Sequence, residues 1–206
     1  MEDNYEKFLL EVEEIERNIL DYSLTRNING NKEIVRGFLS EVKKAGFLNG
    51  DVFRAESDLL VRLLPSAAVS IGVYDKEKNV IIVKAISGLQ SFFESLIKFA
   101  GINLVGKEFP LEDSLANVML SSGKIHKVPK GLKDAALKKV PDAIVSFLDD
   151  LLGPFFVYSG GIIYKGDLIG DVVVILREVS IDGDLSELID RLLPLFGIIN
   201  YYYLKK

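Results

Sequence analysis

The spacing of the apolar residues changes from a helical to a strand pattern at Ala67, and this change limits the possible folds more than any other feature. Before Pro65, apolar residues recur every three or four positions, which predicts helices around residues 34–42 and 51–64. From Ala67 they alternate with small or polar residues, and the polar run Asp75–Asn79 leads into a second β-rich stretch. Two strands joined by so short a turn form an antiparallel hairpin.

A second hairpin is predicted near the C-terminus. Residues 155–164 and 168–177 have strand composition and flank the turn Lys165-Gly166-Asp167. Residues 124–128 are a further strand candidate, and a final helix is predicted to begin at the capping box Asp184-Leu-Ser-Glu187. Helical patterns also cover residues 91–100, 113–122 and parts of 130–150. This order indicates an α+β domain around an antiparallel sheet of about six strands.

Both ends of the chain carry apolar residues at alternating gaps of three and four, the spacing of a coiled-coil seam. In residues 1–22 the seam is surrounded by eight acids and two bases. Six seam residues are assigned to a dimer interface: Val12, Ile15, Ile19, Leu192, Leu195 and Ile199. The alternative is an N-terminal helix that lies on its own domain. Pro194, inside the second seam, is expected to kink or split its helix.

The composition excludes several classes of function. The 206 residues include no cysteine and one histidine, which excludes disulfides, thiolate metal sites, thiol nucleophiles and clustered histidine sites. The net charge of -5 argues against a nucleic-acid-binding protein, whose affinity comes from neutralising phosphates. No apolar run approaches the roughly 18 residues of a membrane span. The acidic N-terminus lacks the pattern of a signal peptide, so a cytoplasmic protein is expected.

Two stretches of the sequence resemble the GAF domain family. Residues Gly106–Val128 are similar to the family's loop, short helix, Ser-Gly turn and third strand, and Tyr164–Leu176 to its last hairpin. With the first hairpin and the last helix, the resemblance covers about Glu33–Lys206. The chain is therefore divided into an N-terminal helix and turn, residues 1–30, and a GAF-like domain, residues 31–206.

The resemblance implies a six-stranded antiparallel sheet with the terminal helices on one face and a ligand pocket beneath crossing loops on the other. The related PAS fold shares much of this topology. Three positions depart from the GAF pattern, because Gly161 replaces the usual proline, Ser114 the usual glycine and Asp171 the usual apolar residue. The family branches that attach bilins or reduce methionine sulfoxide through cysteine are excluded by the absence of cysteine.

Six residues are assigned to the ligand pocket through the resemblance: Phe109, Ser114, Asn117, His126, Tyr158 and Tyr164. Ser114 and Asn117 begin a short helix, where free backbone N–H groups could receive an anionic or carbonyl group. Their alternative role is helix capping. His126 could line the pocket or point outward from its strand, and the tyrosines could offer hydroxyls or act as strand-forming aromatics.

A basic segment lies between the two hairpins. Residues 124–139 contain six lysines and one aspartate, a net charge of +5 that leaves -10 for the remainder of the chain. In the GAF family this segment crosses near the mouth of the pocket, so it could attract an anionic ligand. A solvated helix and loop surface is the alternative.

These features favour a non-catalytic sensory domain that binds an unidentified small molecule, dimerises through its terminal helices and signals to an output domain. That output domain would be a kinase, a cyclase or a transcription factor. No nucleic-acid or membrane partner is expected, and the sequence identifies no cofactor. One alternative is a ligand-free domain for dimerisation or protein interaction. A third is a hydrolase-like enzyme using His126, although the sequence contains no Gly-x-Ser-x-Gly elbow.

Overall fold

The computed structural model describes residues 2–25, 29–44, 46–88, 103–111, 119–129, 155–177 and 181–206. The helices in these ranges are α1 (Glu2–Thr25), α2 (Asn29–Val42), α3 (Val52–Leu63) and α8 (Gly183–Leu204), with a 3₁₀ turn η1 (Phe47–Asn49). The strands are β1 (Ala67–Asp75), β2 (Val80–Ser87), β3 (Glu108–Pro110), β4 (Ile125–Lys127), β5 (Phe155–Tyr164) and β6 (Asp167–Arg177). The change of spacing at Ala67 therefore marks the boundary between helix and sheet, as predicted.

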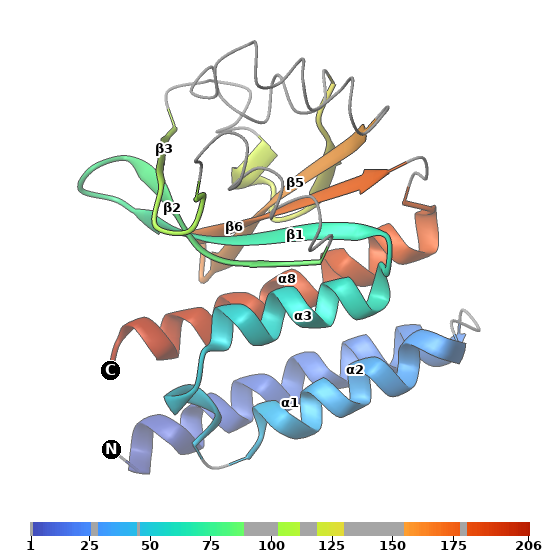
Figure 1. The fold of residues 1–206 in the computed structure, drawn as a ribbon. Coiled ribbons are helices and arrows are strands. Elements are labelled where there is room, and N and C mark those ends of the chain that lie inside the picture. The colour runs from blue at the N-terminus through green and yellow to red at the C-terminus, as the bar shows by residue number, and fades with distance from the viewer. Residues whose placement is uncertain are drawn as a thin grey trace.

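The six described strands form one antiparallel sheet in the order β3-β2-β1-β6-β5-β4 (Figure 1). Both predicted hairpins are present, since β1 pairs with β2 and β5 pairs with β6. Lys165 and Gly166 both have positive φ, at 50° and 87°, which is the backbone twist that a tight two-residue hairpin turn requires. The two hairpins join where β1 pairs with β6, so segments about 100 residues apart form the centre of the sheet. The predicted α+β fold is confirmed.

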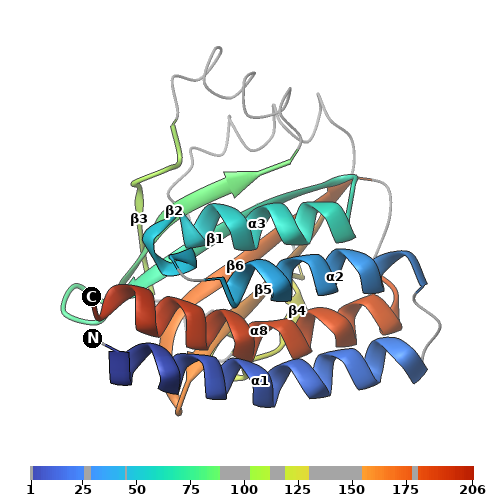
Figure 2. The same cartoon turned by 90° about the horizontal axis from the view of Figure 1, so that it is seen from below.

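The helices cover one face of the sheet in two layers. Figure 1 shows α3 and α8 lying between the sheet and the pair formed by α1 and α2. Helix α8 packs on β5 and β6, α3 packs on β1 and β2, and α1 packs mainly on α8. Seen from below, α1 runs alongside α8 over most of its length (Figure 2).

The apolar seams of α1 and α8 are buried inside this single chain. Five of the six residues assigned to a dimer interface have no exposed surface: Val12, Ile19, Leu192, Leu195 and Ile199. The sixth, Ile15, is half-buried and packs against the same core. The seam spacing predicted the packing surface correctly, but its partner is the other terminal helix of the same chain. The alternative interpretation, an N-terminal helix lying on its own domain, describes the structure.

A dimer formed through these six side chains would require α1 to leave α8. Phe8, Val12 and Ile19 of α1 are fully buried. Burying a large apolar side chain contributes about 1.5–3 kcal/mol, so exposing these three would cost roughly 5–9 kcal/mol. The predicted interface is therefore corrected to an intrachain one.

Helix α8 differs from the prediction at two positions. It begins at Gly183, because the side chain of Asp182 accepts a hydrogen bond from the Leu185 N–H at 2.7 Å and caps the helix. It also continues through Pro194, whose side chain is exposed, so the predicted split does not occur. Buried residues on both sides of Pro194, Leu193 and Leu195 among them, hold the helix on the core.

A carboxyl and an amide face each other inside the helical layers. Glu56 of α3 and Asn200 of α8 have no exposed surface, and the Asn200 Nδ2 donates a hydrogen bond to Glu56 Oε2 at 3.2 Å. Among the described residues, Glu56 Oε1 and Asn200 Oδ1 have no hydrogen-bond partner. Burial raises the pKa of Glu56 well above its ordinary value. A protonated Glu56 would donate to Asn200 Oδ1 and so pair both remaining atoms.

We expect Glu56→Gln to fold and to alter the pH dependence of stability. The folded state holds the Glu56 proton more tightly than the unfolded chain does, so in the wild type stability falls as pH rises from the unfolded pKa through the folded one. Glutamine supplies the same donor without titrating, so the variant should gain stability relative to the wild type across this range. Urea unfolding at pH 5 and pH 9 measures this difference.

Glu56→Ala serves as the control. It leaves Asn200 without a partner and should lose about 1–3 kcal/mol at pH 5. Equal slopes of stability against pH for the wild type and Glu56→Gln would contradict a protonated Glu56.

Candidate functional site

The two faces of the sheet have different surroundings. Alternate residues of a strand point to opposite faces. The core against the helices contains Val69, Ile71, Val172 and Val174. The residues between them, Ser70 on β1 and Val173 on β6, therefore lie on the face turned away from α3 and α8. We call this the outer face.

Four cross-strand neighbours form a row across the outer face. Ser70 pairs with Val173, Val173 with Ser159, and Ser159 with His126, so the row crosses β1, β6, β5 and β4. We call these four residues the outer row. All four are half-buried, although β1, β6 and β5 are interior strands of the sheet. On the helix side of the same strands, Val69 and Val172 are completely buried. The outer row is thus a partly accessible strip of residues that crosses four strands of the sheet.

The structure places two of the predicted ligand residues on this face but at opposite edges. His126 belongs to the outer row on edge strand β4. Phe109 lies on the other edge strand, β3, and pairs with Ile81, which packs with Leu111 and Leu120. Four strands separate Phe109 from His126. At about 4.8 Å between neighbouring strands, the two residues are roughly 24 Å apart. A single small ligand cannot contact both.

The predicted tyrosines lie on the helix side of β5. Tyr158 and Tyr164 are buried in the core against the helices. The Tyr158 hydroxyl accepts a hydrogen bond from the Ile181 N–H at 3.2 Å. The Tyr164 hydroxyl donates to Glu11 of α1 at 2.8 Å, and its ring stacks on Tyr201 with 4.2 Å between centroids. Their hydroxyls therefore join elements of the fold and do not reach the outer face.

Glu11 is the common partner in this aromatic cluster. Besides Tyr164, its carboxylate accepts hydrogen bonds from Lys165 at 3.0 Å and Tyr202 at 3.4 Å. Burial acts to raise the pKa of Glu11, but the hydrogen bonds from Lys165 and Tyr164 outweigh it and lower the pKa. The cluster attaches α1 to the β5–β6 hairpin and to α8.

Some predicted site residues lie outside the described residues. These are Ser114, Asn117 and most of the basic segment, residues 130–139. Of that segment, Lys124 and Lys127 are described and exposed. The Lys127 ammonium lies 4.3 Å from the centroid of the Phe156 ring.

His126 lies beside a serine, as the hydrolase hypothesis requires. Its Nε2 is 2.7 Å from the Ser122 hydroxyl. That hydroxyl also lies 2.7 Å from the Met119 carbonyl and accepts a hydrogen bond from the Lys124 N–H. No carboxylate among the described residues hydrogen-bonds to His126, so the orienting acid of a catalytic triad is missing there.

Asp171 is a polar residue of the outer face that the sequence analysis did not assign to the site. It lies on β6, two residues before Val173, and is only 9% exposed. Burial raises the pKa of Asp171 to about 7, and a backbone hydrogen bond at Gly72 opposes this rise. The available signal was its departure from the apolar residue usual in the GAF pattern.

Glycines flank Asp171 on both neighbouring strands, since it pairs with Gly72 of β1 and Gly161 of β5. A Cβ at Gly72 would lie 2.3 Å from the Asp171 Oδ1, so the carboxyl occupies the space above this glycine. A Cβ at Gly161 would lie 1.7 Å from the Leu120 carbonyl oxygen. Both glycines are required by these close approaches.

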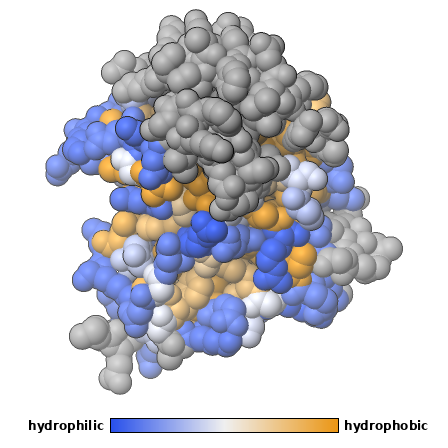
Figure 3. Space-filling model, in the orientation of Figure 1, coloured by the Kyte–Doolittle hydropathy of each residue, from blue (hydrophilic) through white to orange (hydrophobic). Residues whose placement is uncertain are grey.

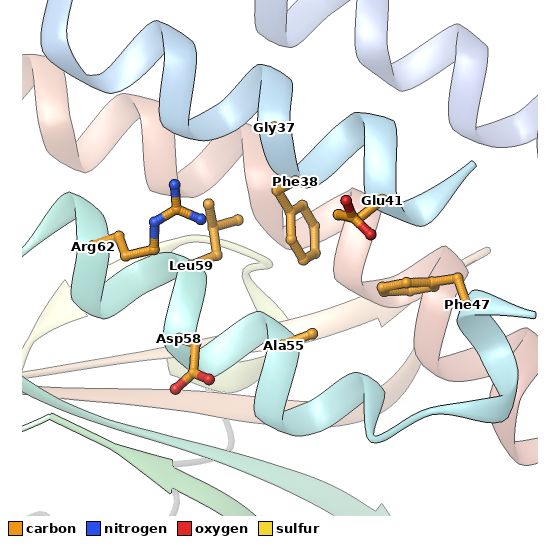
Figure 4. A pocket seen from close by; sticks show the side chains of 8 residues that line it. All are labelled: Gly37, Phe38, Glu41, Phe47, Ala55, Asp58, Leu59 and Arg62. Atoms are coloured by element: carbon orange, nitrogen blue, oxygen red, sulfur yellow. The ribbon is translucent and has the colours of Figure 1, made fainter. Parts of the chain in front are cut away.

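A groove of about 300 Å³ lies on the helical side of the molecule, between α2 and α3. Figure 4 shows Phe38, Leu59 and Phe47 pointing into it, with Arg62 towards one end and Glu41 towards the other. Gly37, Ala55 and Asp58 complete its lining. In Figure 3 apolar residues reach the surface between hydrophilic ones in this helical half. No sequence pattern predicted this groove, because it depends on how two helices pack.

The described residues hold no cluster of three or more histidine, aspartate or glutamate side chains suited to bind a metal ion. None of the described helices has the length and apolar character needed to cross a membrane.

No family model matches the chain, and no curated protein sequence matches it. Its fold, however, is similar to several solved structures. A GAF domain of a phosphoenolpyruvate-protein phosphotransferase from Acinetobacter superposes with a TM-score of 0.58 at 12% identity, over 87% of this chain and 95% of the other. The corresponding domain from Coxiella burnetii gives 0.58 at 19% identity, over 82% and 90%.

A phycoerythrobilin-bound GAF domain from a cyanobacterial phytochrome gives a TM-score of 0.60 at 16% identity, over 85% of this chain and 97% of the other. Together with the sheet order and the position of the terminal helices, these similarities show that the chain has a GAF-like fold.

Proposed function

We propose that the chain is a non-catalytic sensory module that binds a small molecule on the outer face and signals through its terminal helices. The observation that carries this proposal is the outer row. Its residues Ser70 and Ser159 on interior strands and His126 on the edge strand β4 remain partly accessible, whereas helices cover the other face of the sheet. They combine two hydroxyls and an imidazole with the apolar Val173, a mixture typical of small-molecule sites.

The similar structures support this role by analogy. They are domains of a phosphotransferase and a phytochrome, and the phytochrome domain holds a tetrapyrrole. A covalent attachment through cysteine is impossible in this chain. A ligand of this chain is therefore not attached through a thioether.

Helix α8 is placed to report changes in the sheet. A Cβ at Gly197 would lie 2.3 Å from the Ile163 carbonyl oxygen of β5, so the backbones of α8 and β5 are nearly in contact. The Asp190 carboxylate of α8 accepts a hydrogen bond from the Ile125 N–H of β4 at 2.6 Å. Ile125 precedes His126 of the outer row. A ligand that moves β4 would therefore act directly on α8.

The output would leave through α8, towards a kinase, cyclase or transcription-factor domain. Dimerisation and a cytoplasmic location stay predictions. A dimer would have to use surfaces other than the six buried seam residues. Leu10 of α1 and Leu204 of α8 are large apolar residues exposed at 67% and 47%, which makes the outward faces of these helices available.

A ligand-free interaction domain is the second candidate, favoured by the apolar groove between α2 and α3. A hydrolase is less supported, because the Ser122 hydroxyl has backbone partners at hydrogen-bond distance and His126 has no orienting carboxylate among the described residues.

The outer row is tested by filling it. We expect a panel of nucleotides, amino acids and tetrapyrroles to contain a compound that stabilises the wild type by about 2.7 kcal/mol at a hundred times its dissociation constant. Ser159→Phe should abolish that stabilisation, whereas Ser40→Phe, at an exposed position on α2, should keep it. Thermal unfolding measures both. A wild type that no compound stabilises would favour the ligand-free candidate.

The contact between α8 and β4 is tested at Asp190. Asp190→Ala removes the acceptor of the Ile125 N–H, and losing a hydrogen bond to a charged group costs about 1.5–3 kcal/mol. Hydrogen exchange at Ile125 should therefore accelerate, and a stabilising compound should no longer protect α8 amides. Asp190→Asn keeps a carbonyl acceptor and should preserve both signals. Unchanged protection of α8 in Asp190→Ala would contradict this route of transmission.

A further inference from the structure

Asp171 is a buried carboxyl on the outer face whose position is explained neither by the core nor by the helices. We propose that Asp171 receives a positively charged nitrogen of the ligand, so that the outer face selects an amine, amidine or guanidine compound. This inference rests on the proposed function, because it names the chemistry of a ligand bound on the same face.

The carboxyl lies in the interior of the sheet. Strand β6 is bordered by β1 and β5, and two strands separate it from the edge strand β3 while one separates it from β4. Its cross-strand neighbours Gly72 and Gly161 have no side chains, although the Leu120 backbone lies over Gly161. Towards the outer row, the next residue of β6 on this face is Val173, which lies between Ser70 and Ser159. A ligand that lies on the outer row would therefore have Asp171 next to one of its own ends.

No cation among the described residues pairs with this carboxyl, which has a hydrogen bond with the Gly72 backbone. The half-buried Glu16, by comparison, pairs with Lys43 at 2.8 Å. An ionised carboxylate that is buried without a cation is costly, which agrees with a pKa of about 7. A bound cation would favour the ionised form of this carboxyl.

The fully buried Glu56 is an acid of this fold that has a side-chain hydrogen-bond partner. It meets the amide of Asn200, which offers both a donor and an acceptor to a protonated carboxyl. Asp171 has no such partner among the described side chains. It lies on the outer face, two residues along β6 from Val173, which pairs with Ser70 and Ser159.

The surroundings also define the kind of cation. One carboxylate, with no cluster of metal-binding side chains among the described residues, does not suit a divalent metal ion. The methyl groups of Ile81 lie beside Gly72, next to the carboxyl. A nitrogen cation attached to a small apolar body matches this combination of one charge and an apolar flank.

Three compounds of nearly equal shape test the proposal. Benzamidine is a cation, benzamide is neutral and benzoate is an anion. In NMR titrations at pH 7.5, benzamidine should shift the amide signals of Gly72 and Gly161, and the other two should bind at least tenfold more weakly. Asp171→Asn should weaken benzamidine binding about tenfold or more. Asp167→Asn, which removes an exposed acid from the same strand, should leave it unchanged.

Equal binding of benzamide or benzoate, or equal binding of benzamidine to Asp171→Asn, would overturn the inference. So would the absence of any benzamidine response at Gly72 and Gly161. The proposed function is tested by a separate experiment. It survives if another compound stabilises the wild type and is blocked by Ser159→Phe, and it fails if no compound does.

The carboxyl itself gives a second measurement that does not depend on how the variant folds. In carbon-detected NMR, the titration midpoint of Asp171 should lie near pH 7 and move to lower pH when benzamidine is saturating. Binding should strengthen about tenfold between pH 6 and pH 8 in the wild type. His126 lies on the same face, so the part of the pH dependence that Asp171→Asn removes is the part due to Asp171. A midpoint that does not move would refute the contact.

Discussion

The packing of α8 against β5 and β6 is the contact on which the rest of this structure depends. At Gly197 and Gly160 there is no side chain to hold the helix away, so the helix backbone and Leu193 come directly onto β5. This close approach buries most of α8 and, together with α3 on β1 and β2, covers one face of the sheet with helices. It also determines where α1 lies, because α1 packs mainly on the surface of α8 that the sheet leaves free.

Sealing one face has a direct consequence for the other. The apolar residues needed for stability are concentrated between the sheet and the helices, so the outer face can carry hydroxyls, an imidazole and a carboxyl without weakening that core. Ser70, Ser159 and His126 lie on this face beside smaller apolar clusters, one of which packs Met119 and Val157 against Val173. A stabilising face and a variable face are consistent with a fold that is shared with GAF domains of 12% and 19% identity.

The two buried acids show how the same functional group takes different roles on the two sides. Glu56 lies between helices, where the amide of Asn200 donates a hydrogen bond to it. Asp171 lies over Gly72 on the outer face, where it has a hydrogen bond with the Gly72 backbone and no side-chain partner among the described residues. Both have raised pKa values because both are buried. They differ in that Glu56 has a side-chain hydrogen-bond partner, whereas Asp171 lies on the outer face with no side-chain partner among the described residues.

The sequence by itself determined the elements and their class. Both hairpins and the amphipathic terminal helices could be predicted because their signals depend on residues that are close in sequence. These signals are the periods of 3.6 and 2 residues, the Lys165-Gly166 turn and the change of spacing at Ala67.

Only the tertiary structure decided which face of each element is covered and by what. An alternating strand has two faces whichever way it turns, so Tyr158 and Tyr164 were assigned to the ligand side although they face α8 and α1. A seam at coiled-coil spacing fits any apolar partner, so Val12 and Ile199 were assigned to a second chain although each is buried within this one. Likewise, the distance between Phe109 and His126 follows from strand order, which contacts between distant segments establish and local patterns do not contain.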